Sequence, residues 1–203
     1  MAKNWKIRKD LSIEVCGHTL FRIECTQDFM EIKAGTLGGY IEKEENLDGN
    51  AWVYGDAWVY GNAWVSDDAQ VYGNARVYGN AQVYGIARVS DDAQVYGDAR
   101  VYGNARVYGD AQVYGDARVY GDKITNKDDI CYISNRCYNI TITPLNIKIG
   151  CQYHAQEAWW NFTNEQIKKM DGDDAINFWK IWKEPLKQIC DAMKKEKGEK
   201  DVK

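Results

Sequence analysis

Residues 51–62 read AWVYGDAWVYGN, and this six-residue unit recurs twelve times without an insertion, as far as Asp122. A short fixed period indicates stacked units rather than an irregular globular fold. Alanine and valine stand two residues apart in each unit, so in an extended segment both side chains point to the same side, which we expect to be the interior. Glycine followed by Asn or Asp supplies the positive-φ backbone of a tight corner. The period therefore predicts short strands joined by corners.

Three units close one coil of 18 residues, and successive coils are expected to pair like strands of a parallel sheet about 4.8 Å apart. The repeat predicts four full coils over residues 49–122, in a mainly β chain. Read from its valine, the unit VYGNAQ fits the hexapeptide pattern, with an aliphatic and a small residue in fixed places. The chain thus resembles proteins with a left-handed parallel β-helix, and the resemblance alone supplies the hand of the helix.

The flanks of the repeat predict caps, because the end of a solenoid exposes unpaired backbone and apolar core. Residues 1–48 are expected to form an N-terminal β cap, with a hairpin over residues 12–25. In residues 123–152 the β-branched and aromatic composition predicts an irregular β segment of three strands, either a final coil or a small sheet. An α-helical cap over residues 153–197 and a disordered tail over residues 198–203 complete the prediction.

Local signals divide the helical cap. Thr163 to Gln166 has the form of a capping box and predicts a short helix that ends near Asp171 and Gly172. Apolar residues at helical spacing then predict a second helix, which Pro185 should kink or split.

The flanking sequences carry a second resemblance. The runs AGTLGGYIEKEENL and ITITPLNIKIGCQYH, followed by WxxFT and FWKIWK, are similar to hexapeptide-repeat proteins of bacteriophages and prophages. This resemblance implies an accessory protein of a mobile element and, further, an antagonist of host defence.

Charge and composition limit the function classes. The chain has 203 residues and a net charge of −4, and the repeat holds nine Asp and five Arg. Without a basic stripe we expect no duplex nucleic-acid binding, although an acidic column mimicking nucleic acid stays an alternative. No apolar run reaches the roughly 20 residues that span a bilayer. We therefore expect no membrane association and a cytoplasmic protein of the bacterial host cell, with its six scattered cysteines reduced.

The best-known enzymes with the fold that this chain resembles are acyltransferases. Their chemistry needs a histidine base near the subunit seam, and the repeat contains none. We therefore expect no enzyme, no catalytic residue and no cofactor; if an acyltransferase were present, His154 would be its base. Ser66-Asp67-Asp68 and Ser90-Asp91-Asp92 are expected to be solvated turns rather than metal sites.

Aromatic residues supply candidates for interfaces. The residue between Ala and Val faces outward, and in the first coil it is tryptophan on all three faces. Such tryptophans either anchor a partner or lie under a cap, and those of the helical region either anchor a partner or form its core. The partner-binding candidates are Trp52, Trp58, Trp64, Trp159, Trp160, Trp179 and Trp182.

One face carries an unbroken tyrosine ladder with a single arginine, Arg76. Interfaces are rich in tyrosine and poor in charge, so this face is expected to hold a homotrimer together. The alternative is that the tyrosines shield the backbone of a monomer. The ladder consists of Tyr60, Tyr78, Tyr96 and Tyr114.

Stacked arginines suggest an anionic ligand. Arg88 with Arg106, and Arg100 with Arg118, lie 18 apart in sequence next to tyrosines. These pairs favour an anionic, stackable ligand such as a cyclic nucleotide, or else they balance nearby aspartates. Ile86 interrupts the polar corners and is expected to mark a contact point.

These observations predict a non-enzymatic, oligomeric accessory protein that binds a host protein or protein complex. The alternatives are a sponge that sequesters a nucleotide signal at subunit seams, and an acyltransferase.

Overall fold

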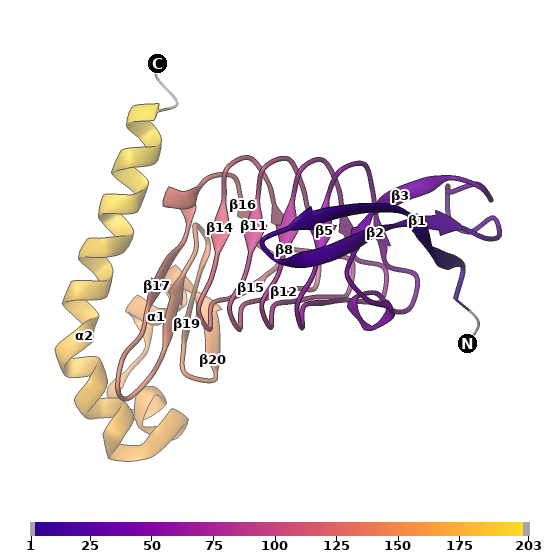
Figure 1. The fold of residues 1–203 in the computed structure, drawn as a ribbon. Coiled ribbons are helices and arrows are strands. Elements are labelled where there is room, and N and C mark those ends of the chain that lie inside the picture. Colours follow the sequence, from indigo (N-terminus) through magenta and orange to yellow (C-terminus); the bar gives the residue numbers. More distant parts are fainter. Residues whose placement is uncertain (1–2, 201–203) are drawn as a thin grey trace. The chain divides into compact units, whose positions relative to one another are not determined.

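A column of short parallel strands forms most of the first of two compact units (Figure 1). The computed structural model describes residues 3–200; the first unit ends at Lys127 and the second begins at Asp128. The repeat strands are β4 (Trp52–Val53), β5 (Trp58–Val59), β6 (Trp64–Val65), β7 (Gln70–Val71), β8 (Arg76–Val77), β9 (Gln82–Val83), β10 (Arg88–Val89), β11 (Gln94–Val95), β12 (Arg100–Tyr102), β13 (Arg106–Val107), β14 (Gln112–Val113), β15 (Arg118–Tyr120) and β16 (Lys123–Ile124).

These strands form three parallel sheets, which we call the three faces. The first face continues from β3 through β5, β8, β11 and β14; the second holds β4, β7, β10, β13 and β16; the third holds β6, β9, β12 and β15. Residues 18 apart pair, as in Trp52 with Gln70, and Tyr54 N donates to Val71 O at 2.8 Å. Every repeat alanine and valine is at most 1% exposed, so they form the interior. The predicted parallel β-helix is confirmed, while its hand stays a prediction.

The column is longer than the repeat, with about five turns. Strand β3 (Leu37–Ile41) pairs in parallel with β5, Ile41 lies opposite Val59, and Leu47 bridges to Val65. Part of the segment predicted as a cap is therefore an incomplete coil in the same 18-residue register. A Cβ on Gly39 would lie 2.5 Å from Val53 Cγ1, so even alanine does not fit there.

An antiparallel hairpin precedes this incomplete coil. Strands β1 (Trp5–Val15) and β2 (His18–Cys25) pair with each other, and β2 pairs with β3. The predicted hairpin is confirmed and extends back to Trp5. A 3₁₀ turn, η1 (Glu44–Asn46), connects β3 to the repeat, and a second, η2 (Lys127–Asp129), follows it.

The second unit is a small antiparallel sheet with two helices. Its strands pair in chain order, and its helices are α1 (Gln156–Asn161) and α2 (Asn164–Lys200). The predicted small sheet has a fourth strand, β20, that the composition did not indicate. The strands are β17 (Cys131–Ile133), β18 (Ile140–Ile142), β19 (Asn146–Ile149) and β20 (Gln152–Ala155).

The helical predictions are partly confirmed. Thr163 N donates to Gln166 Oε1 at 2.9 Å and Gln166 N donates to Thr163 Oγ1 at 3.2 Å, which is the predicted capping box. The helical backbone breaks at Asp171 and Gly172, as expected. Pro185 was expected to kink or split the helix; it does not split it, because α2 runs through Pro185. The prediction of a tail from residue 198 was wrong, because α2 continues to Lys200; the rest of that tail lies outside the described residues.

Candidate binding surfaces

The three tryptophans of the first coil are equivalent in sequence but differ in exposure. Trp52 is 0% exposed, Trp58 is half-buried and Trp64 is 37% exposed. Phe29 packs edge-on against Trp52 with 5.6 Å between ring centroids, and a Cβ on Gly38 would lie 2.8 Å from Trp52 Cζ2. Of the two expectations for Trp52, a partner anchor or a residue under a cap, the first is wrong and the second is confirmed, because the N-terminal segment covers it.

Two tryptophans of the second unit form its core. Trp159 and Trp179 are 2% and 4% exposed with ring centroids 5.3 Å apart, and Trp159 Nε1 donates to Ile147 O at 2.8 Å. Of the two expectations for these tryptophans, partner anchors or core residues, the second is confirmed, because both belong to the buried cluster of helix and sheet residues. Trp160 and Trp182 are half-buried at the edge of this core.

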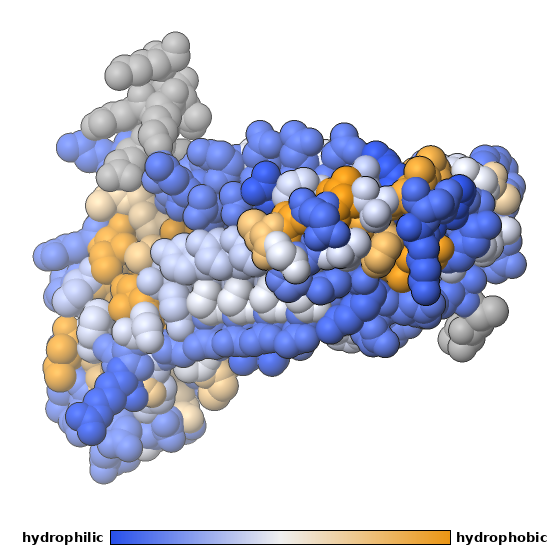
Figure 2. Space-filling model, in the orientation of Figure 1, coloured by the Kyte–Doolittle hydropathy of each residue, from blue (hydrophilic) through white to orange (hydrophobic). Residues whose placement is uncertain are grey.

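An apolar groove lies beside Trp182. Its ring stacks on Phe178 with 5.7 Å between centroids, and Ile181 is 69% exposed. Apolar side chains reach the surface of the second unit in Figure 2 as well. The groove has a volume of about 420 Å³ and is lined by Cys137, Tyr138, Asp171, Asp174, Asn177, Phe178, Ile181 and Trp182.

One rim of this groove is acidic. The Tyr138 hydroxyl donates to Asp171 Oδ2 at 2.7 Å, and this hydrogen bond, together with burial, raises the pKa of Tyr138 to about 12. Asp174 lines the same groove and is exposed. The surface therefore combines an apolar floor with carboxylates.

The tyrosine ladder of the first face stacks on itself. Ring centroids of Tyr60, Tyr78 and Tyr96 are 5.2 and 5.1 Å apart with nearly parallel planes, and Tyr114 follows at 5.7 Å. Arg76, expected at the same interface, lies over Trp58 at 4.6 Å from the ring centroid. Figure 2 shows how side chains of like hydropathy form rows along the column.

The third face carries a shorter ladder beside one predicted arginine pair. Tyr84 and Tyr102 stack at 5.1 Å, and Tyr120 follows at 5.2 Å. Arg100 lies opposite Arg118 in register. Ser66 interrupts this face at its N-terminal end, where the Trp64 ring lies 6.5 Å from Tyr84.

The second face has a gap in the middle of its ladder. Ser90 replaces a tyrosine between Tyr72 and Tyr108. Next to this gap lies the other predicted arginine pair, in which Arg88 is directly opposite Arg106. A groove of about 340 Å³ opens there, lined by Tyr72, Arg88, Ser90, Asp91, Arg106, Tyr108 and Lys123.

Lys123 joins this site although the repeat ends before it. It pairs with Arg106 at a spacing of 17 residues instead of 18, and its Nζ lies 5.2 Å from the centroid of the Tyr108 ring. The six-residue period does not place Lys123 on this face. The pair of a basic residue and Ile124, which resembles the Arg-Val pairs of the repeat, is the sequence feature that indicates it.

The two aspartates that replace corner glycines have a backbone role. Asp67 and Asp91 both have φ of 58°, and their carboxylates accept the N–H groups of Gly85 at 2.9 Å and Gly109 at 3.1 Å in the next coil. Within the described residues, no three His, Cys, Asp or Glu side chains gather at a point that could hold a metal ion. Ile86 is 60% exposed and follows Gly85 at the same corner of the column as Asp67.

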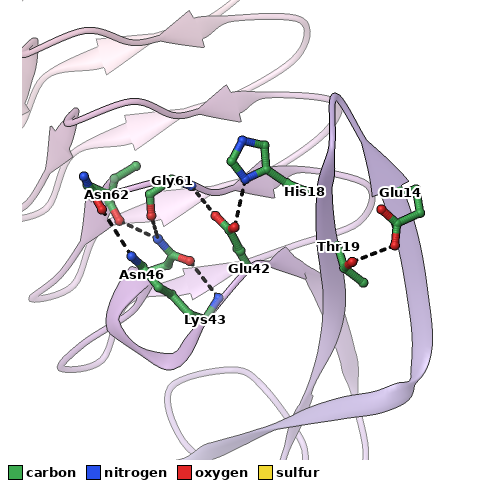
Figure 3. Close-up of polar contacts among 9 residues, drawn as sticks. Glu14, His18, Thr19, Glu42, Lys43, Asn46, Gly61 and Asn62 are labelled. Atoms are coloured by element: carbon green, nitrogen blue, oxygen red, sulfur yellow. Dashed lines mark hydrogen bonds and ion pairs between the residues drawn. The ribbon is translucent and has the colours of Figure 1, made fainter.

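Both histidines make contacts that hold parts of the fold together. His18 Nδ1 lies 2.8 Å from Glu42 Oε1, Glu42 also accepts the Gly61 N–H at 2.6 Å, and together they fasten the hairpin to the first coil (Figure 3). His154 packs edge-on against Trp159 and Phe162, and burial lowers its pKa.

A comparison of the sequence with known protein families also identifies the repeat as a β-solenoid. A family model described as the YdcK beta solenoid repeat matches residues 69–85, 81–97, 93–109 and 111–124. These matches include the Ser90 gap and cover less than half of the chain. Fold and match together define a β-solenoid repeat protein. No curated protein matches the chain at a significant level.

In the described part of the chain, no helix is both long and apolar enough to cross a membrane.

Proposed function

We propose that this chain is a non-enzymatic binding protein that takes up a protein partner in the apolar groove of its second unit. The observation that supports this proposal is the exposure of Ile181, 69%, next to the stacked rings of Phe178 and Trp182. Aromatic and aliphatic side chains in a hollow are the usual anchors of protein interfaces.

The chemistry of the groove selects the kind of partner. Asp171 and Asp174 line the same surface as the apolar floor. A segment with an apolar side chain flanked by Lys or Arg complements both features, since the apolar group leaves water and the charges steer association. The proposed partner therefore presents a basic, partly apolar segment.

The resemblance of the flanks to phage and prophage proteins supports a role inside an infected bacterial cell. In this proposal the partner is a host protein or protein complex, and this chain inhibits the partner by covering its functional surface. The tyrosine ladder of the first face, Tyr60 to Tyr114, would join three copies, which multiplies the number of grooves per assembly.

Affinity capture from prophage-bearing bacteria tests the proposal. The wild-type chain is compared with Ile181→Lys in the groove and with Leu145→Lys, a matched control on a residue of the same unit that is 63% exposed and does not line the groove. We expect wild type and the Leu145 variant to retain the same host protein, and the Ile181 variant to lose it. Equal retention by all three chains, or retention by none, contradicts the proposal.

A further inference from the structure

The Ser90 gap has the dimensions of a missing aromatic ring. In the intact ladders, successive tyrosine rings stack 5.1–5.7 Å apart. Tyr72 and Tyr108 are two coils apart, which is about 10 Å at the strand spacing of a parallel sheet. On this face Tyr54 and Tyr72 meet edge-on at 6.4 Å. A planar ring placed in the gap would have a tyrosine on either side at an ordinary aromatic contact distance.

The gap is distinct from the other interruption in the repeat. Ser66 follows the incomplete first coil, so only Tyr84 flanks it from the tyrosine position, and Trp64 already lies beside that ring. At Ser90 the flanking residues are tyrosines on both sides, and a groove is open between them. Of the two interruptions, only the one at Ser90 can hold a ring between two others.

Three cations line the same groove in successive coils. Arg88 lies opposite Arg106, which lies opposite Lys123, and all three are exposed. Within the described residues neither arginine makes an ion pair or a side-chain hydrogen bond. Like charges directly opposite each other in a sheet are destabilising. A bound anion would remove that repulsion and satisfy the guanidinium donors.

We propose that the Ser90 gap binds a nucleotide, with its base between Tyr72 and Tyr108 and its phosphate against Arg88, Arg106 and Lys123. The base supplies the planar π-face that the gap lacks, and stacking between a base and an aromatic side chain is tolerant of base identity. The phosphate supplies a negative counter-ion for the three cations. Asp91, the one carboxylate of the groove, keeps the phosphate on the basic side.

This site is independent of the groove in the second unit. All of its cations and rings belong to the repeat or to the residues directly after it, so every residue of the site lies in the first unit. The binding is reversible and changes no covalent bond. The column would therefore hold a nucleotide while the second unit holds a protein.

Calorimetric titration of the full chain with AMP, GMP, CMP and UMP at low salt tests the proposal. Adenosine, which lacks the phosphate, and inorganic phosphate, which lacks the ring, are the comparison ligands. We expect at least one monophosphate to bind saturably, and both comparison ligands to bind about tenfold more weakly or less. A chain that shows no saturable heat with any monophosphate at millimolar concentration overturns the proposal.

Ser90→Tyr is the decisive variant, because it restores the residue of the regular repeat and fills the gap. Loss of one stacked base predicts binding weaker by about 5- to 150-fold. Arg106→Gln, which installs another regular repeat residue, should weaken binding about tenfold or more. Arg136→Gln makes the same change at an exposed arginine that no candidate site includes and should leave binding unchanged.

The two kinds of variant keep the test valid if one of them folds poorly, as judged by circular dichroism. Monophosphate binding that survives both Ser90→Tyr and Arg106→Gln overturns the site. Equal weakening by Arg106→Gln and Arg136→Gln also overturns it, since that result indicates diffuse electrostatic attraction rather than a built groove.

Discussion

Replacing Trp52 with alanine should destabilise the column far more than the same change at Trp64, although both occupy the same position of the repeat. Trp52 is fully buried under the N-terminal segment, whereas Trp64 is 37% exposed and touches Tyr84 at a tilt. Removal of a buried tryptophan side chain costs about 3–5 kcal/mol when the cavity cannot collapse.

The structure also supplies an opposing contribution. Trp52 Nε1 is buried and, within the described residues, has no hydrogen-bond partner. Burial of an unpaired N–H costs about 1–3 kcal/mol, and Trp52→Ala removes that cost. We therefore expect a net loss of about 2 kcal/mol for Trp52→Ala and less than about 1 kcal/mol for Trp64→Ala. Trp52→Phe should be nearly neutral, because it keeps an aromatic ring and removes the N–H.

Urea unfolding followed by far-ultraviolet circular dichroism measures these differences in the free energy of unfolding. Hydrogen exchange of the Phe29 and Ile32 amides, which bond to each other's carbonyl groups, gives a local reading, since loss of Trp52 should loosen the segment that covers it. If the two alanine variants lose the same stability, or if the exchange of the Phe29 and Ile32 amides does not change in Trp52→Ala, the proposed packing of the N-terminal segment on the first coil is wrong.

Three further predictions concern charge and assembly. Burial raises the pKa of Glu42, but the hydrogen bonds with His18 and the Gly61 N–H outweigh burial, so the pKa is lowered. The ionised carboxylate therefore stabilises the fold at any pH above the ordinary pKa of a glutamate. This contribution is lost as the pH falls through the lowered pKa. Glu42→Gln should therefore cost about 1 kcal/mol at pH 7 in urea unfolding, with the difference from wild type vanishing in acid; a constant difference would contradict the role of its charge. The pKa of Tyr138, raised to about 12 by its bond to Asp171, means that the neutral hydroxyl stabilises the second unit below pH 10 and that this contribution disappears between pH 10 and 12. Tyr138→Phe should remove that alkaline step from a stability–pH profile, and a step that persists assigns it to another group. In light scattering we expect three copies of the 23.3 kDa chain and dissociation by Tyr96→Glu on the first face but not by Tyr102→Glu on the third; a wild-type mass of one chain refutes the trimer.

The architecture was predictable because its information is local and periodic. Ala and Val at fixed spacing define the interior, and glycine with φ near 60–75° defines most corners. The incomplete coil before the repeat was missed because Gly39, Ile41 and Leu47 do not follow the A-x-V pattern. Their place depends on pairing with residues 18 positions later, which composition does not reveal.

The candidate surfaces were predictable in part. The period alone places Arg88 beside Arg106 and leaves Ser90 between two tyrosines. It does not include Lys123, whose register is shifted by one residue. The groove around Ile181 has no sequence signature, because an exposed isoleucine and a buried one are the same letter on a helix.

The sequence by itself determined the coil, its interior and the register of its faces, since each of these follows from which side chains repeat every six residues. Only the tertiary structure decided which members of equivalent sets are available to a partner. Trp52 and Trp64 share one position of the repeat, yet the segment around Phe29 and Gly38 covers the first and leaves the second exposed. Burial depends on contacts between distant parts of the chain, and a local repeat carries no information about them.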